Sequence, residues 1–176
     1  MSKTNNITFG DSKIFAIEIA PSTNSKKYYL RLWFQDNAFG DFKRSGVLLS
    51  IIKGYFKFLN HIDSLYEKKF DVMTDREIFD DIVNVVQRNL PQEQEDVLIQ
   101  RMMSYEFPTG DYQLTDFGIV LINVKQEGIV KLLIYEMSDK NKSPQFYSYA
   151  IPTKYFFEVY ESFVQYAHDN NLFKSK

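Results

Sequence analysis

The sequence predicts an α+β fold, a single-domain sandwich in which an antiparallel or mixed sheet of about five to six strands packs with three or four helices. Alternation of apolar residues with period two near both ends of the chain is typical of half-buried strands. Apolar spacings of three and four residues between them are typical of amphipathic helices. The content of 44% apolar and 25% charged residues is that of a globular protein. A chain of 176 residues fits one core, so we expect residues 1–176 to form one domain.

The first predicted element is a hairpin with strands at residues 14–20 and 28–35. A repeated tripeptide brackets it, with Phe-Gly-Asp at residues 9–11 and again at residues 39–41. Glycine tolerates positive φ, and aspartate can accept a hydrogen bond from the backbone just after it, so each copy indicates a turn. Residues 39–42 can add a short third strand.

Helical spacing begins after Ser45, which we expect to be the N-cap of a helix of about six turns. The predicted apolar stripe of this helix consists of Leu48, Ile52, Tyr55, Leu59, Ile62 and Tyr66. Thr74-Asp75-Arg76-Glu77 matches a capping box and predicts a second helix. The inward residues expected for that helix are Ile78, Phe79, Ile82, Val83 and Val86. A third helix is expected at residues 93–104.

The C-terminal part predicts a second hairpin, with strands at residues 119–124 and 129–137 joined around Gly128. We expect Val120, Ile122 and Val124 to face the same core as Val130, Leu132 and Ile134. The opposite faces are also apolar, which indicates that the hairpin is covered on both sides. A strand at residues 145–151 and a helix starting at residues 152–153 complete the fold. The expected buried stripe of that helix is Phe156, Val159, Tyr160, Phe163 and Ala167.

Cysteine usage and hydropathy predict a cytoplasmic protein. The chain has no cysteine, which excludes disulfides and fits a reducing compartment. Its first six residues have no apolar stretch typical of a secretion signal. The longest apolar runs are far shorter than the ~20 residues that a membrane span needs, so we expect no membrane partner.

No motif in the sequence indicates catalysis. Its two histidines, His61 and His168, have no second ligand at metal-binding spacing. Nucleophile elbows and phosphate-binding glycine loops are also missing from the sequence. We therefore expect no catalytic residue, no metal and no cofactor, with a small enzyme built from dispersed residues as the less favoured alternative.

Acidic residues are concentrated between residues 71 and 96, where eight carboxylates and two arginines give a charge of −6 in a chain of net charge −2. Such a segment repels nucleic acid and favours a basic partner. We predict partner-binding carboxylates within its first part: Asp71, Asp75, Glu77, Asp80 and Asp81. The alternative for Asp75 and Glu77 is that they complement the positive end of a helix dipole.

A second predicted partner-binding group consists of Tyr29, Arg31 and Trp33, which share one face of the second predicted strand. Tyrosine, arginine and tryptophan are the residues most enriched at interface hot spots. Two alternatives compete with this interpretation: a helix covers the face, or Arg31 simply stacks on Trp33.

The opening of the chain resembles a bacterial polymorphic-toxin immunity family, immunity protein 42. The resemblance lies in Phe-Gly-Asp at residues 9–11 and the following Phe-Ala-Ile-Glu at residues 15–18. It continues in Leu-Trp-Phe at residues 32–34, Phe-Gly-Asp-Phe at residues 39–42 and residues 46–52, so it covers about the first sixty residues. The resemblance implies a small cytoplasmic protein without catalytic residues that binds and blocks a cognate toxin. An intracellular adaptor or regulatory module is the alternative class.

Overall fold

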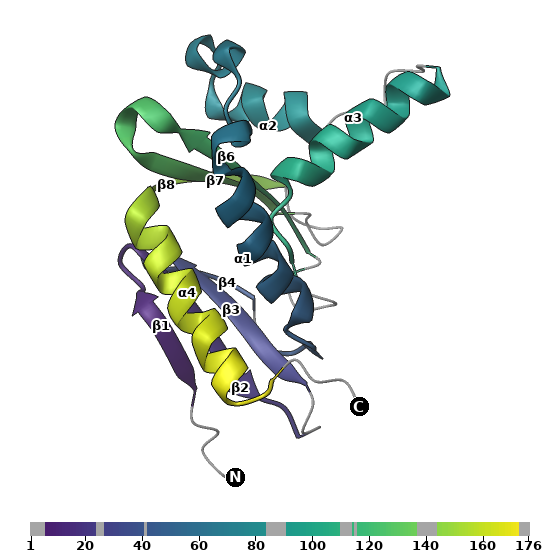
Figure 1. The fold of residues 1–176 in the computed structure, drawn as a ribbon. Coiled ribbons are helices and arrows are strands. Elements are labelled where there is room, and N and C mark those ends of the chain that lie inside the picture. Colours follow the sequence, from purple (N-terminus) through teal and green to yellow (C-terminus); the bar gives the residue numbers. More distant parts are fainter. Residues whose placement is uncertain are drawn as a thin grey trace.

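The computed structural model describes residues 6–23, 27–40, 42–83, 91–109, 114, 116–136 and 144–172. Within these ranges it contains two antiparallel sheets and four α-helices, which confirms the α+β class (Figure 1). The strands are divided between a five-stranded and a three-stranded sheet. Within the same ranges, no helix has the length and apolar character needed to cross a membrane.

The five-stranded sheet is formed by the N-terminal part of the chain. Its strands are β1 (Ile7–Asp11), β2 (Phe15–Pro21), β3 (Tyr28–Phe34), β4 (Asn37–Phe39) and β5 (Ser45–Gly46). Their order is β1-β2-β3-β4, and β5 also pairs with β3. The predicted hairpin is confirmed as β2 and β3. The strand β1, which was not predicted, pairs along its whole length with β2.

The glycine of each repeated tripeptide has a backbone conformation that other residues rarely adopt. Gly10 and Gly40 have φ of +92° and +97°, which disfavour any other residue. A Cβ at Gly10 would lie 2.4 Å from the Phe15 carbonyl oxygen. The Lys13 N–H donates to Asp11 Oδ1 at 2.9 Å, which confirms the expected aspartate turn. The aspartate of the second copy, at position 41, is outside the described residues.

The helix α1 (Leu49–His61) is shorter than predicted and starts later. The prediction of Ser45 as N-cap is wrong, because Ser45 lies in β5 and pairs with Tyr29. After His61 the chain continues as the 3₁₀ helix η1 (Ile62–Leu65). The predicted stripe is also partly wrong, because Leu59 is 47% exposed. The residues that α1 buries are Ile51, Ile52, Gly54, Tyr55 and Phe58.

The capping box is confirmed at the start of α2 (Asp75–Val83). The Thr74 N–H donates to Glu77 Oε2 at 2.7 Å, and the Glu77 N–H donates to Thr74 Oγ1 at 3.3 Å. Ile78, Phe79 and Ile82 are buried as expected. The expected inward position of Val86 is outside the described residues.

Two further helical segments flank α2. The 3₁₀ helix η2 (Lys68–Val72) precedes it, and the expected third helix is confirmed as α3 (Gln92–Tyr105). Figure 1 shows α3 projecting from the body of the molecule, with its C-terminal end nearest the sheets. Only Tyr105 of α3 is fully buried.

The three-stranded sheet contains β6 (Phe117–Val124), β7 (Ile129–Glu136) and β8 (Gln145–Pro152). The 3₁₀ helix η3 (Lys125–Glu127) and Gly128 join β6 to β7. The predicted assignment of faces is wrong, because Leu121 pairs with Leu132 and therefore shares its face. Val120 and Ile122 lie on the other face. Both faces are covered as expected, and Phe79 of α2 packs against Tyr135 and Phe146.

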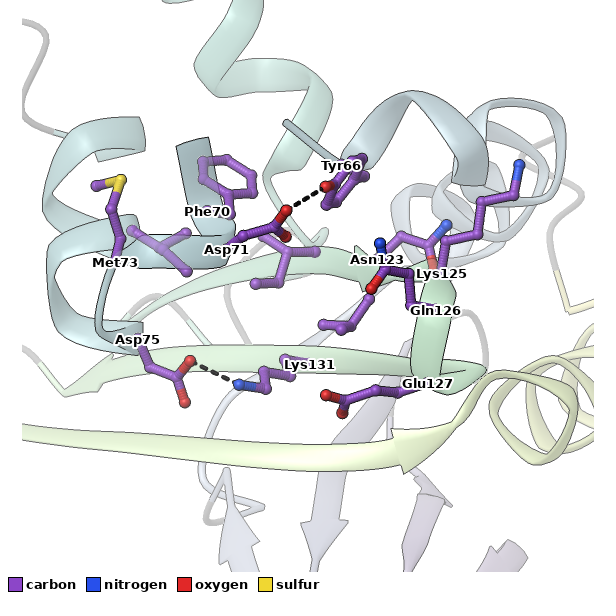
Figure 2. Close-up of a pocket in the computed structure, with 13 residues that line it drawn as sticks. Tyr66, Phe70, Asp71, Met73, Asp75, Asn123, Lys125, Gln126, Glu127 and Lys131 are labelled. Atoms are coloured by element: carbon purple, nitrogen blue, oxygen red, sulfur yellow. Dashed lines mark hydrogen bonds and ion pairs between the residues drawn. The ribbon is translucent and has the colours of Figure 1, made fainter. Parts of the chain in front are cut away.

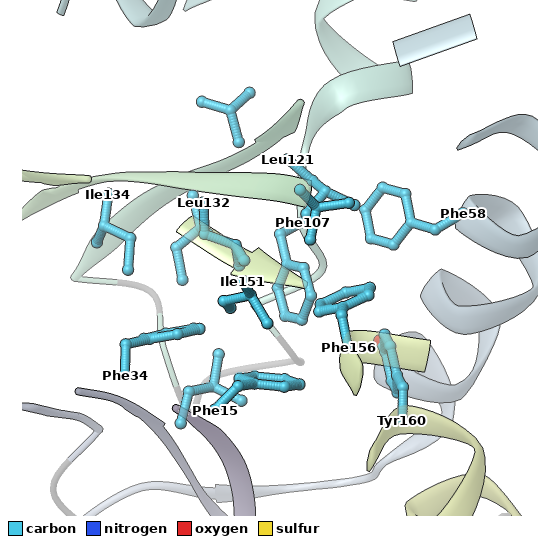
Figure 3. Close-up of a cluster of buried hydrophobic side chains, with 14 of the residues drawn as sticks. Phe15, Phe34, Phe58, Phe107, Leu121, Leu132, Ile134, Ile151, Phe156 and Tyr160 are labelled. Atoms are coloured by element: carbon cyan, nitrogen blue, oxygen red, sulfur yellow. The ribbon is translucent and has the colours of Figure 1, made fainter. Parts of the chain in front are cut away.

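The core lies where the two sheets meet α1 and α4 (Thr153–Asp169). Figure 3 shows side chains from both sheets and both helices converging there. Phe15 stacks on Phe34 and on Phe156, and Phe34 stacks on Tyr149 across the two sheets. The predicted stripe of the last helix is confirmed, because all five of its residues are buried.

Candidate functional site

The row Tyr29, Arg31 and Trp33 lies on the face of β3 that points away from the core. These residues alternate with Leu30, Leu32 and Phe34, which are fully buried. Figure 1 shows α1 and α4 on one side of the five-stranded sheet. Phe156 of α4 stacks on Phe15, the partner of Phe34, so these helices cover the face opposite the row. The side chains of the row are half-buried.

Glu18 on β2 holds this row in place from a position that the sequence analysis did not select. It pairs with Arg31 across the strands and is only 7% exposed. Trp33 Nε1 donates to Glu18 Oε2 at 2.8 Å, and Arg31 NH1 lies 3.4 Å from the same oxygen. Asn6 Nδ2 donates to the other carboxylate oxygen, Oε1, at 2.7 Å. A charged residue inside the apolar alternation of β2 was the sequence signal for this role.

Arg31 is fixed by aromatic rings as well as by Glu18. Its guanidinium carbon lies 4.3 Å from the ring centroid of Phe42 and 5.5 Å from that of Trp33. Its Nε donates to the Gly40 carbonyl oxygen at 3.1 Å, and the Phe42 ring lies 6.0 Å from that of Tyr29. We call these residues the β3 patch: Glu18, Tyr29, Arg31, Trp33 and Phe42. Preordered side chains of this kind lose little entropy when a partner binds.

An open hollow of about 530 Å³ adjoins the β3 patch at Trp33 and Glu18. Its other walls are Thr8, Gly10, Asp11 and Ser12 at the β1–β2 turn. The hollow therefore combines one large ring with several polar groups, a composition that suits a protein partner.

The predicted acidic residues lie elsewhere, on and around α2 against the three-stranded sheet. Asp75 forms an ion pair with Lys131 at 2.8 Å and accepts a hydrogen bond from Ser148 at 2.5 Å. Asp81 lies 2.6 Å from Lys69 and 2.7 Å from Arg101. Lys131, Lys69 and Arg101 are all outside the acidic segment of the sequence, so the fold compensates part of its charge.

The other predicted carboxylates have local partners and remain on the surface. Glu77 belongs to the capping box at the start of α2. This position agrees with the alternative in which Glu77 complements the positive end of the helix dipole. Asp80 pairs with Arg76 at 2.9 Å one turn earlier, and Asp71 accepts a hydrogen bond from the Tyr66 hydroxyl at 2.7 Å. Among the described residues, only Asp80 of these three carboxylates has a basic partner, so the negative potential of this surface is only partly reduced.

A partly buried network links η2, α2 and α3. Glu67 accepts hydrogen bonds from Arg101 Nε at 2.7 Å and from the Tyr105 hydroxyl at 2.9 Å. Arg101 also joins Asp81, and Lys69 bridges Glu67 and Asp81 at 3.3 and 2.6 Å. Positive and negative groups alternate around this network, so each charge faces opposite charges.

The network shifts the pKa values of its members. Partial burial acts to raise the pKa of Glu67, but hydrogen bonds from Arg101, Tyr105 and Lys69 outweigh it and hold the pKa below its ordinary value. The pKa of Asp81 is lowered in the same way, against its burial, by Lys69 and Arg101. Burial, aided by the Glu67 carboxylate, raises the pKa of Tyr105 well above its ordinary range. These groups therefore remain in one charge state near neutral pH.

A cleft of about 390 Å³ opens between α2 and the end of the β6–β7 hairpin (Figure 2). Its polar walls include Asp71, Asp75 and Lys131, and Figure 2 shows Tyr66 and Asn123 beside Asp71 at one end. Ile78 and Ile122 are among its apolar walls. We call this space the α2 cleft. Its apolar walls and carboxylates suit a long basic side chain of a partner.

The structure does not bring the two predicted groups together. Tyr29, Arg31 and Trp33 belong to the five-stranded sheet, whereas α2 packs against β7 of the other sheet. The chain therefore has two separate candidate surfaces, the β3 patch and the acidic surface around α2.

The described residues contain no arrangement that indicates catalysis. No group of three or more histidine, aspartate or glutamate side chains among them is placed to hold a metal ion. His61 is exposed near the C-terminal end of α1, and His168 lies 3.5 Å from Asp169 at the end of α4. Both histidines thus lie near the C-terminal ends of helices, where a cation is favoured.

Comparison with known proteins gives one clear match. The sequence model of a family described as immunity protein 42 matches residues 1–166 of this chain. The match thus extends far past the N-terminal residues that carry the resemblance and includes both candidate surfaces. No curated protein and no solved structure matches the chain.

Proposed function

Because this chain belongs to the immunity protein 42 family, we propose that it binds a cognate bacterial toxin domain and neutralises it by occluding the active or substrate-binding surface. The observation that carries this proposal is the family match over residues 1–166. Membership supports an immunity function and, in general terms, a toxin partner. A protein that acts by occupying a surface needs no catalytic residues of its own.

We propose the β3 patch as one part of the toxin interface. Trp33 offers a large ring beside the open hollow, and Arg31 is already held by Glu18 and by two aromatic rings. Side chains that are ordered before binding lose little conformational entropy in the complex, so more of their contact energy contributes to affinity. An interface of ~800 Å² on each partner would extend beyond the patch onto the hollow and the neighbouring β1–β2 turn.

We propose a second contribution from the acidic surface around α2. Asp71, Glu77 and Asp80 are at least partly exposed there, and Asp75 and Asp81 add carboxylates held by ion pairs. A toxin that acts on a polyanionic substrate needs a basic cleft, and carboxylates that face this cleft would imitate the substrate and speed capture. On this view the partner is a protein rather than a nucleic acid or a membrane.

Co-expression with the adjacent reading frame tests the proposal directly. If that frame encodes the cognate toxin, induction of the toxin alone should kill cells, and co-expression of this chain should restore growth. The two proteins should then co-purify at a fixed ratio. A toxin from a different immunity pair, expressed at the same level, is the control and should remain lethal. Measured turnover of a small substrate by this chain, abolished by one polar substitution, would contradict the proposal.

We also propose that the chain acts in the cytoplasm, where a toxin directed at its own producer would meet its target. Rescue that persists when the toxin is produced inside the cell, without export, is the expected result.

A further inference from the structure

The strand β8 differs from the other sheet edges of the described chain. The edge of β6 is covered, because the Phe107 N–H donates to the Ile119 carbonyl oxygen at 2.8 Å. At the two edges of the other sheet, β4 has three residues and β1 has five, the last of which is a charged aspartate. The edge strand β8 has eight residues and no charged side chain. Long uncharged edges are uncommon, because they invite pairing with another chain.

The ladder between β7 and β8 fixes which backbone groups of β8 point outward. The Thr153 N–H donates to the Gly128 carbonyl oxygen at 2.9 Å, just beyond the last pair, Ile129 with Pro152. In an antiparallel ladder this bond makes the last pair a non-hydrogen-bonded one, and the two kinds of pair alternate from there. The N–H groups of Phe146, Ser148 and Ala150 therefore point away from β7. No described residue accepts a hydrogen bond from them.

The side chains of β8 alternate between the two faces of the sheet, perpendicular to the direction of its N–H groups. Ser148 and Ala150 are exposed, whereas Tyr149 and Ile151 between and after them are buried. Pro144 precedes the strand and Pro152 is its last residue, and neither has an N–H, so the free edge offers three N–H groups and the carbonyls of the same residues. Outward N–H groups at every second residue match the backbone spacing of an extended peptide.

We propose that an extended segment of the toxin adds to the three-stranded sheet by pairing with β8. The inference rests on the proposed toxin-binding function and names the contact that would anchor the toxin. Main-chain hydrogen bonds to residues 146, 148 and 150 supply the affinity, and side chains next to α2 supply the selectivity.

Charges beside the edge favour a toxin segment over a second copy of this chain. Ser148 donates to Asp75 at 2.5 Å, and the Arg76–Asp80 pair lies over Phe146, with the Arg76 guanidinium 5.4 Å from its ring. Asp75 and Asp80 are paired there with Lys131 and Arg76, but α2 as a whole carries four carboxylates and one arginine. Pairing of two β8 strands would bring two acidic α2 helices to the same side of one sheet, where they repel. A segment with basic side chains on that side is attracted instead.

Amide hydrogen exchange on the unaltered chain tests the pairing residue by residue. In the free chain, the amides of residues 146, 148 and 150 should exchange fast, while those of 147, 149 and 151 should be protected by the ladder. Addition of the toxin from the co-expression experiment should slow the first set by at least ~10-fold. Unchanged exchange of these three amides in a complex that neutralises the toxin would overturn the inference and leave the proposed function standing.

A matched pair of variants gives a second measurement. Ala150→Pro removes an outward N–H without removing a bond of the β7–β8 ladder, so it should weaken toxin affinity at least ~10-fold while the chain stays folded. Ala150→Thr keeps the N–H and should bind as the unaltered chain does. Equal affinity of both variants overturns the inference. If the three amides are protected from exchange without toxin, and this protection rises with the concentration of the chain, a second copy occupies the edge. That result also overturns the inference. Failure of the chain to bind any toxin would remove the inference together with the proposed function.

Discussion

Glu18 and Trp33 come from neighbouring strands, and the indole N–H of Trp33 donates to the Glu18 carboxylate at 2.8 Å. The same carboxylate oxygen lies near Arg31, so one buried acidic group orients two side chains of the β3 patch. Burial of a carboxylate is costly unless its hydrogen-bonding capacity is used, and here three donors use it. The patch is therefore rigid before any partner arrives.

Glu18→Ala should lower the free energy of unfolding by about 2 kcal/mol, because Trp33 and Arg31 lose their common acceptor. Urea denaturation measures the change, and Glu127→Ala is the control, since Glu127 is an exposed carboxylate on η3. A stability equal to that of the control would show that the buried carboxylate does not hold the patch together.

Trp33→Ala should weaken toxin binding by ~2 kcal/mol or more if Trp33 anchors the interface. Trp33→Phe keeps a ring but removes the N–H that reaches Glu18, so it separates ring contact from hydrogen bonding. Calorimetric titration measures both variants, and circular dichroism checks their folding. Loss of folding in Trp33→Ala would identify the residue as structural, and unchanged affinity would exclude it from the interface.

Gly54→Ala should destabilise the chain by about 1–3 kcal/mol, because the new Cβ would lie 2.2 Å from Pro108 Cγ and 3.1 Å from the Tyr160 hydroxyl. Tyr160 is completely buried, so α1 or the Pro108 loop has to shift to relieve these contacts. Gly118→Ala is the matched control, with its nearest side-chain atom at 3.5 Å. Thermal unfolding that ranks the two variants in the opposite order would contradict the close packing at Gly54.

The acidic surface can be tested without breaking the fold. Asp71→Asn and Glu77→Gln together remove two charges but keep an acceptor for Tyr66 and a capping residue for α2. The association rate with the toxin should fall at least ~3-fold at low salt and approach that of the unaltered chain at high salt. Asp75 and Asp81 are left in place because their ion pairs hold α2. Equal rates at low salt would argue against electrostatic capture by this surface.

Stability should decrease in acid because of the network around Glu67 and Asp81. Their folded-state pKa values are lowered, so their contribution is complete above the unfolded-state pKa values and is lost as pH falls through the folded-state values. Unfolding measured between about pH 6 and pH 3 should show this loss. Asp81→Asn should flatten the profile, whereas Asp63→Asn, on an exposed pair with Lys125, should leave it unchanged. A profile of Asp81→Asn that parallels the unaltered chain would contradict the assignment.

Helices with a strong local signal were predicted well from the sequence. The stripe of α4 and the capping box at Thr74 depend on residues a few positions apart, which the sequence shows directly. The start of α1 was wrong because Ser45 pairs with Tyr29 in the sheet, a contact that local spacing does not reveal. The faces of β6 and β7 were also wrong. Both faces are apolar, so alternation could not distinguish between registers that differ by one residue.

The candidate surfaces were predicted in part. The outward direction of Tyr29, Arg31 and Trp33 followed from alternation, because the neighbouring residues of β3 are apolar. The role of Glu18 was missed, since it depends on which residue of β3 lies opposite it. The compensation of the charge of −6 between residues 71 and 96 was missed for a similar reason. Lys69, Arg101 and Lys131 are distant in sequence and reach its carboxylates only in the folded chain.

The stacking of Phe15 on Phe156 joins the N-terminal sheet to α4 near the C-terminal end of the chain. Phe15 is completely buried, and its cover comes from a helix near the end of the chain. Full burial of Phe15 therefore has to wait until residue 156 has been synthesised and α4 has docked. Copies of the chain that end before α4 should therefore leave this ring uncovered and fail to complete the core.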